Sequence, residues 1–228
     1  MDWNRYKPLI HADQSKFGVR LRRPDRMERV GRTSDLDVLL IRPSSSSFAK
    51  RRAEQVARLA MTEPLGEGGY GTPQYYAGDP YNIVPELHAH ALLLCHQARG
   101  VGMLVCERRP VLGHLEWQRD LNNYGELVDE PSNVRWAVVH IWVMSQHRKK
   151  GAATGMIKIL ANGLHLKPSE LAWMPPFSTG GKAMLRSFQF TRLLVATNRV
   201  PSEDVAFDQP WRDAPPRLEQ AAVTDGRS

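Results

Sequence analysis

The most informative segment of the chain is Val143-Met144-Ser145-Gln146-His147-Arg148-Lys149-Lys150-Gly151-Ala152-Ala153. The residues that lead into it, 134–144, favour a strand and are apolar on both faces, as is typical of a central strand. The residues that follow predict a helix over 147–162 with one apolar face and with Gly163 as its stop. The first amides of a helix have no partner within it and lie at the positive end of its dipole. Next to three cations and several small residues, these amides predict a pyrophosphate site.

Short alternating segments on both sides of this turn predict one mixed α/β domain over residues 35–197. The expected elements are a strand at 37–41, a helix at 48–61, a hairpin of strands 90–96 and 102–107 with its turn at 98–100, the central strand and helix, a strand at 170–174, a helix at 179–188 and a strand at 190–196. Strict alternation along the central strand would place Trp136 and Trp142 on one face. A stretch rich in glycine, proline and tyrosine, 64–85, predicts a long loop, and 110–132 is polar.

The two ends of the chain differ from this domain in composition. Residues 1–34 hold nine basic and four acidic side chains, so +5 of the net charge of +7 lies there. Their sparse apolar residues show no period, which predicts a basic arm outside the folded domain. Residues 198–228 are rich in proline and in charged and small residues, which predicts a flexible tail.

Composition excludes several classes of protein. Hydrophobic residues make up 42% of the chain, enough for a core. No apolar run approaches the ~20 residues that span a bilayer, and the amino terminus lacks a secretory signal, so we expect a soluble, cytoplasmic protein with no membrane partner. The two cysteines, Cys95 and Cys106, argue against a disulfide scaffold. Glu86, His88 and His90 have a spacing that suits zinc, but no fourth ligand is recognisable, so no metal is expected.

The central segment resembles a known family. Its pattern Val143-x-Ser145-x-x-Arg148-x-x-Gly151-x-Ala153 is similar to the acetyl-coenzyme A signature of the GCN5-related N-acetyltransferases (GNAT). A narrower likeness to the establishment-of-cohesion acetyltransferases lies in Ile141-Trp142-Val143-Met144-Ser145, Arg148-Lys149-Lys150, Met156-Ile157, Ala172-Trp173 and Gly181-Lys182. The chain departs from that second family because no zinc finger precedes the domain and because Met174-Pro175-Pro176 stands where the family has an acidic residue.

The resemblance implies a GNAT-like acyl-coenzyme A N-acyltransferase fold in a single domain. It also implies a coenzyme site in which the central strand pairs with the pantetheine arm and the following turn holds the pyrophosphate. The implied pantetheine residues are Ile141, Trp142 and Val143, and the implied pyrophosphate residues are Arg148, Lys149, Lys150, Gly151, Ala152 and Ala153.

Acyl transfer to an amine requires a base for the ammonium and an acid for the thiolate. The tyrosine that serves as acid in the family is absent, because Leu185 occupies its position. Ser145 is a candidate acid or proton relay by the same resemblance, although it suits a helix N-cap as well. His140 and Glu107 are candidate bases on neighbouring strands. As alternatives, His140 is a hydrogen-bonded core residue, and Glu107 pairs with Arg108 or Arg109 or lies in solvent.

These features predict an acetyl-coenzyme A-dependent N-acetyltransferase whose acceptor is a protein lysine or a small-molecule amine. Tyr70, Tyr75 and Tyr76 fall in the variable region that covers the acceptor in this fold, so they are the expected substrate contacts. The alternative is a non-catalytic module that binds nucleic acid or another partner through residues 1–34 and uses the domain as a scaffold or an acyl-coenzyme A sensor. The sequence leaves the oligomeric state open, a homodimer included.

Overall fold

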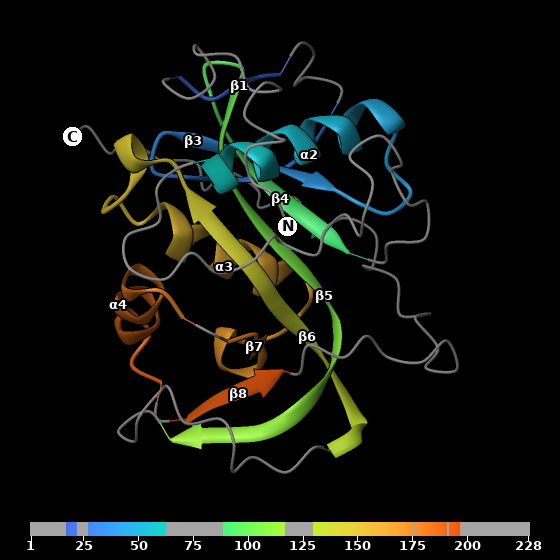
Figure 1. Cartoon of the computed structure of the whole chain (residues 1–228), viewed down its shortest axis with the longest axis vertical. Helices are drawn as coiled ribbons and strands as arrows, with labels where there is room; N and C mark the ends of the chain where they lie inside the picture. The colour runs from blue at the N-terminus through green and yellow to red at the C-terminus, as the bar shows by residue number, and fades with distance from the viewer. Residues whose placement is uncertain are drawn as a thin grey trace, which may run out of the picture.

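The computed structural model describes residues 17–21, 27–62, 89–116, 130–175, 177–190 and 192–196, which form one mixed sheet with helices on both faces (Figure 1). The elements are β1 Val19–Arg20, β2 Glu28–Thr33, β3 Leu36–Ile41, α2 Ser47–Thr62, β4 His90–His96, β5 Arg99–Glu116, β6 Glu130–Val143, the 3-10 turn η4 Ser145–His147, α3 Ala152–Gly163, the 3-10 turn η5 Pro168–Glu170, β7 Ala172–Trp173, α4 Thr179–Ser187 and β8 Arg192–Ala196. The sheet order is β2-β3-β4-β5-β6-β7-β8, and β1 pairs with β5. The expected α/β class is therefore confirmed.

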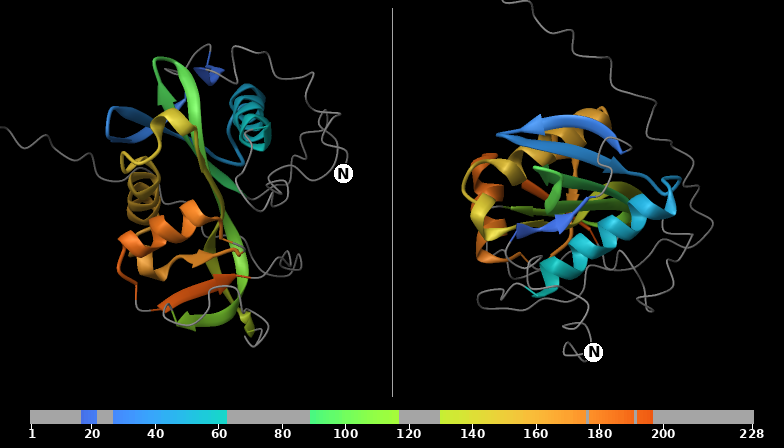
Figure 2. Two further views of the ribbon diagram at one scale, coloured as in Figure 1. Left: turned by 60° about the vertical axis from the view of Figure 1, so that its left-hand side comes forward. Right: turned by 90° about the horizontal axis from the view of Figure 1, so that it is seen from above.

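The helices lie in two layers, one on each side of the sheet. Helix α2 packs against β5, β1 and β3, and α3 packs against β2, β4, β5 and β6. Figure 2 shows α2 on one side of the sheet and α3 and α4 on the other. One face of α2 is apolar and buried, with Ala49, Ala53, Val56, Ala57 and Ala60 at most 6% exposed. No helix in the described part of the chain is long and apolar enough to cross a membrane.

The pairing of β6 with β5 contains one extra residue on the β6 side. Cys106 pairs with Val138, and the residue before it, Val105, pairs with His140. Val139 therefore has no partner of its own in β5 and forms a β-bulge. An extra residue reverses the alternation of side chains beyond it. Trp136 and Trp142 consequently lie on opposite faces of the sheet, and the prediction that they share a face is wrong.

Strand β5 is longer than the sequence indicated. It extends to Glu116 and covers part of the polar stretch 110–132, where no strand was predicted. A register shift between Val111 and Gly113, where Gly113 has φ of 135°, bends the strand so that its end pairs with β8. Because β5 also pairs with β6, and β7 joins β6 to β8, the four strands close on one another.

The predicted basic arm contains two strands of the sheet. Strand β2 pairs with β3 along its whole length, and β1 pairs with β5 at Val19 and Gly100. The described part of 1–34 thus belongs to the folded domain, and the expected boundary at residue 35 is wrong. Residues 1–16 and 22–26, the tail 198–228 and the loop 64–85 lie outside the described residues.

The hairpin turn and the start of the central helix differ in position from the predictions. The β4–β5 hairpin turns at Gln97 and Ala98, whose φ values of 48° and 60° give the double left-handed turn that suits a two-residue hairpin, rather than at 98–100. Helix α3 begins at Ala152, after η4, and not at 147. Gly163 is its last helical residue, and the left-handed residue that ends the segment is His165, with φ of 54°.

Candidate functional site

Strands β6 and β7 run together for two residues and then separate. Ala137 pairs with Ala172 and Val138 with Trp173, and the Met174 amide donates to the Val138 carbonyl at 3.1 Å. Within the described residues β7 offers no further partner to β6, which continues to Val143 alongside β5 (Figure 1). One edge of β6 is therefore open over 139–143.

The backbone groups on this open edge belong to alternate residues. The Met144 amide donates to the Val101 carbonyl at 2.9 Å, so Met144 directs its backbone toward β5. By the alternation of an antiparallel pair, Trp142 also faces β5, whereas Ile141 and Val143 face the open edge. Of the three residues expected to pair with a pantetheine arm, two point the right way. The Val143 carbonyl already accepts a hydrogen bond from Arg148 Nε at 2.6 Å.

The turn that follows β6 is built from left-handed residues. After η4, Lys149 has φ of 60° and Gly151, the N-cap of α3, has φ of 77°. The first helical hydrogen bond runs from the Gly155 amide to the Gly151 carbonyl at 2.8 Å, so the amides of 152–154 precede the helical ladder. Among the described residues, and apart from its chain neighbours, no atom lies within 4 Å of the position that a Cβ on Gly151 would take.

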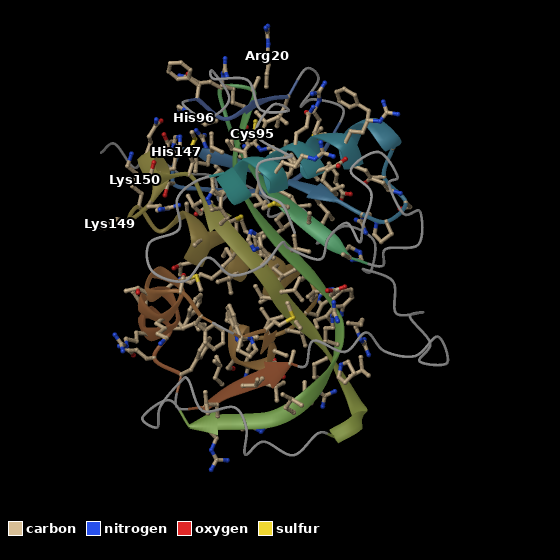
Figure 3. All side chains as sticks on the ribbon, in the orientation of Figure 1. Arg20, Cys95, His96, His147, Lys149 and Lys150 are labelled. Carbon is tan, nitrogen blue, oxygen red and sulfur yellow. The ribbon has the colours of Figure 1, made fainter. Side chains whose placement is uncertain are left out.

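The same turn carries the cations that we predicted beside a phosphate. Arg148, Lys149 and Lys150 are all exposed. Figure 3 shows His147, Lys150 and Lys149 along the upper left side of the molecule, with His96 next to His147. Amides at a helix start, a left-handed turn and exposed cations together suit an anionic ligand.

Residues far away in sequence hold this turn in place. Ser34, in the turn between β2 and β3, donates its hydroxyl to the Lys150 carbonyl at 2.6 Å. The rings of His147 and His96 lie 5.0 Å apart, and His96 Nε2 lies 3.8 Å from an Asp35 carboxylate oxygen. Sequence reasoning missed Ser34, Asp35 and His96, because nothing in the spacing of the chain links position 34 to position 150.

The pKa of His147 reflects these surroundings. Partial burial lowers it below its ordinary value, and the nearby His96 and Lys150 lower it further, while Asp35 opposes them. His147 is therefore neutral at neutral pH.

Two of the three candidate catalytic residues share a face of the sheet. Val105 pairs with His140, and Glu107 is two residues along β5 from Val105, so both side chains lie on the α2 side. Ser145 is exposed in η4, five residues beyond His140, which is about 16 Å along an extended strand. The structure thus brings His140 and Glu107 together and places Ser145 at the phosphate-type turn. The alternative that Ser145 caps the helix is wrong, because Gly151 is the N-cap of α3.

His140 and Glu107 differ in their partners. His140 Nε2 is buried and makes no hydrogen bond among the described residues, and burial lowers the pKa of this imidazole to about 4. The alternative of a hydrogen-bonded core histidine is not supported at that nitrogen. Glu107 accepts a hydrogen bond from Arg109 at 2.5 Å, and Arg109 is only 1% exposed. The alternative that Glu107 pairs with Arg109 is confirmed.

Several predicted site residues are not placed. Tyr70, Tyr75 and Tyr76 lie outside the described residues, as do Glu86 and His88. Among the residues that the structure describes, no three histidine, cysteine, aspartate or glutamate side chains gather in a way that could hold a metal ion. Cys95 and Cys106 are buried and unbridged, as expected of core residues.

Comparison with known proteins adds to this geometry. No family model matches the sequence, and no curated protein matches it. Among solved structures, the xEco2 acetyltransferase domain aligns with a TM-score of 0.54 and 18% identity, over 77% of this chain and 98% of that chain. The chain therefore has the fold of the xEco2 acetyltransferase domain.

Two further solved structures are similar to this chain. The xEco2 acetyltransferase domain bound to a K105-CoA conjugate aligns with a TM-score of 0.54 and 16% identity, over 77% of this chain and 99% of that chain. A ribosomal-protein-alanine N-acetyltransferase from Brucella melitensis biovar Abortus 2308 aligns with a TM-score of 0.41 and 19% identity, over 73% of this chain and 96% of that chain. A TM-score below 0.5 does not by itself establish a shared fold. The fold expected from the central segment is confirmed by the xEco2 domain.

Proposed function

We propose that this protein is an acetyl-coenzyme A-dependent N-acetyltransferase that acts on a primary amine. The observation that carries the proposal is the open edge of β6, which leads directly into the left-handed turn at the start of α3. An extended edge and an anion-binding turn, joined in this order, fit a ligand with an amide-containing arm and a pyrophosphate. The xEco2 domain with the same fold has been solved with a CoA conjugate, which supports this choice of ligand.

The residues of the chain have distinct tasks in this proposal. Ile141 and the Val143 amide bind the pantetheine arm from the open edge, and the amides of 152–154 with Arg148, Lys149 and Lys150 bind the pyrophosphate. Acetyl-coenzyme A supplies the acyl group as a thioester. Gly151 supplies the left-handed turn that aims the amides outward, and Ser34 fixes that turn through the Lys150 carbonyl.

In this proposal the amine loses its proton on the α2 side of the sheet, where both candidate bases lie. His140 is neutral at neutral pH, because burial holds its pKa at about 4, so its imidazole has a lone pair available for a proton from the incoming amine. Glu107 lies on the same face, and its ion pair with Arg109 holds the carboxylate in place. Ser145 lies too far along the strand to serve the same proton, and we assign it to the coenzyme end of the site.

Binding and thiol release test the proposal. We expect acetyl-coenzyme A at millimolar concentration to raise the unfolding temperature of the wild type, and Gly151→Glu to abolish that rise, since a carboxylate would stand where the pyrophosphate lies. Ser44→Glu is the matched control, because it adds the same charge at an exposed position in the turn after β3. That position is separate from the β2–β3 turn, which contacts the turn between β6 and α3. Thiol release measured across amines and lysine peptides then identifies the acceptor class. Wild-type protein that acetyl-coenzyme A does not stabilise would contradict the proposal.

A further inference from the structure

Trp173 has a buried donor with no acceptor. The residue ends β7 and is 2% exposed, and its indole Nε1 makes no hydrogen bond among the described residues. Leaving a buried N–H unbonded costs about 1–3 kcal/mol, and native proteins rarely keep such a group without a reason. A tryptophan at this position is therefore unexplained by packing alone, because phenylalanine would fill similar space without that cost.

The place of Trp173 in the fold suggests the reason. Trp173 pairs with Val138, and the next hydrogen bond, from Met174 to the Val138 carbonyl, is the last link between β6 and β7. The indole thus lies at the point where the two strands separate, which is where the open edge of β6 begins. Any ligand that follows that edge inward ends at this point.

Trp173 and His140 lie on opposite faces of the sheet. Because Val138 pairs with Trp173 in a parallel ladder, their side chains share one face, and the Trp173 ring lies 6.4 Å from that of Phe190, which follows α4. The adjacent Ala137 and Ala172 belong to a separate cluster on the other face. His140 lies on that other face, with Glu107. Two buried ring nitrogens without described partners therefore flank the separation point from the two sides.

We propose that the Trp173 indole N–H donates a hydrogen bond to the sulfur of the bound thioester and of the thiolate that departs from it. This role rests on the proposed function. The amine nitrogen bonds to the acyl carbon and its proton passes to the base on the α2 side. The carbon–sulfur bond then breaks, the sulfur leaves with the bonding pair as a thiolate, and the thiolate takes its proton from solvent.

The chemistry of the site explains why such a donor is useful. The acid expected from the family resemblance is absent, since Leu185 occupies its position in α4 and is 1% exposed. An indole N–H does not ionise near neutral pH, so Trp173 stabilises negative charge on sulfur rather than transferring a proton. Hydrogen bonds to a charged acceptor are stronger than those between neutral groups, and they gain further where water is excluded. The amine then enters from the His140 side, and the thiolate forms on the Trp173 side.

The first test removes only the N–H group. Trp173→Phe should lower kcat for thiol release by about 10- to 100-fold, the range expected for one hydrogen bond to a charged group, with little change in KM for acetyl-coenzyme A. Trp136→Phe is the matched control, because Trp136 lies on β6 two residues before Val138, is paired with Arg108 of β5 and has its ring under the Arg108 guanidinium. An unchanged kcat in Trp173→Phe would overturn the proposal.

The second test measures binding without turnover. As pH rises through the range in which the thiol ionises, the wild type should bind coenzyme A more tightly than desulfo-coenzyme A, and Trp173→Phe should lose this gain while binding desulfo-coenzyme A as before. If Trp173→Phe does not fold, the wild-type comparison of the two ligands still decides, since equal pH dependence would refute a donor to sulfur. Wild type that binds neither ligand would refute the proposed function. Wild type that binds and releases thiol, with an unaffected variant, would refute the role of Trp173 alone.

Discussion

Gly151 sets the direction of the amides at the start of α3. Its φ of 77° lies in the left-handed region, where a Cβ is disfavoured, although no described atom beyond its chain neighbours lies within 4 Å of where that Cβ would be. We expect Gly151→Ala to lower the free energy of unfolding by about 1–2 kcal/mol through backbone strain alone. The matched control is Gly180→Ala in the first turn of α4, where φ is ordinary and the nearest atom is 4.0 Å away. Equal effects of the two substitutions in urea unfolding would contradict this account.

His140 should make stability depend on pH. Burial lowers its pKa from 6.5 to about 4 in the folded chain, so the unfolded chain binds more protons between those values. The stabilisation is present above pH 6.5 and is lost as pH falls toward 4, an effect on the order of 3 kcal/mol. The pKa of His147 is lowered as well, so His147 contributes a pH dependence of the same sign. The effect of His140 is therefore measured by comparing a variant with the wild type. The free energy of unfolding of His140→Gln should fall less steeply from pH 7 to pH 4 than that of the wild type, and parallel curves would show that His140 does not titrate this way.

At the scale of elements, periodicity and turn residues predicted most of the core of the fold. The α2 helix, the β4–β5 hairpin, the central strand, α3 and α4 were recognised because each carries a local pattern. Strand β5 was cut short because Pro110, Gly113 and His114 break its apolar pattern, yet two different partners, β6 and β8, satisfy its two halves. The bulge at Val139 has no local signal, since it depends on register between strands.

The site was predictable to the same degree. The turn from 148 to 153 carries its chemistry in consecutive residues, and the sequence pointed to it. Ser34 and His96 contact that turn across long separations, and an unpaired buried nitrogen such as that of Trp173 becomes visible only when its neighbours are known. Residues 28–33 looked like an arm because an exposed edge strand carries arginines on its outer face.

Strand β2 and helix α3 lie in close contact because α3 has a glycine, Gly155, where it faces Thr33 of β2. A Cβ on Gly155 would lie 1.8 Å from Thr33 Oγ1 and 2.5 Å from Thr33 Cβ, so only glycine fits there. We expect Gly155→Ala to push β2 from α3 and to cost about 1–3 kcal/mol of stability. Because Ser34 is next to Thr33, acetyl-coenzyme A should also stabilise the variant less. Thr33→Gly in the same chain removes both clashing atoms and should restore part of each loss, and a double-mutant cycle without coupling would contradict the contact.

At the scale of the whole molecule, the first strands and the phosphate-type turn form one structure. Strand β1 packs against α2, β2 packs against α3, and the turn after β2 holds the Lys150 carbonyl. Arg20, Arg29 and Arg32 thus both supply positive charge and lie in strands of the sheet. A deletion of 1–34 would remove charge and fold together, and it cannot distinguish a nucleic-acid arm from a structural element.

We therefore expect deletion of 1–34 to lower the unfolding temperature and to abolish stabilisation by acetyl-coenzyme A. Replacing Arg20, Arg29 and Arg32 by alanine in the full chain removes charge and keeps the strands. All three are exposed, and the ion pair of Arg29 with Asp37 at 3.0 Å is a surface pair worth little stability. This triple variant should keep the unfolding temperature and the acetyl-coenzyme A response. If the deletion spared both properties, β1 and β2 would be dispensable, and the arm interpretation would return. If the wild type bound nucleic acid in a salt-dependent way and the triple variant did not, that binding would belong to the arginines on the folded edge of the sheet.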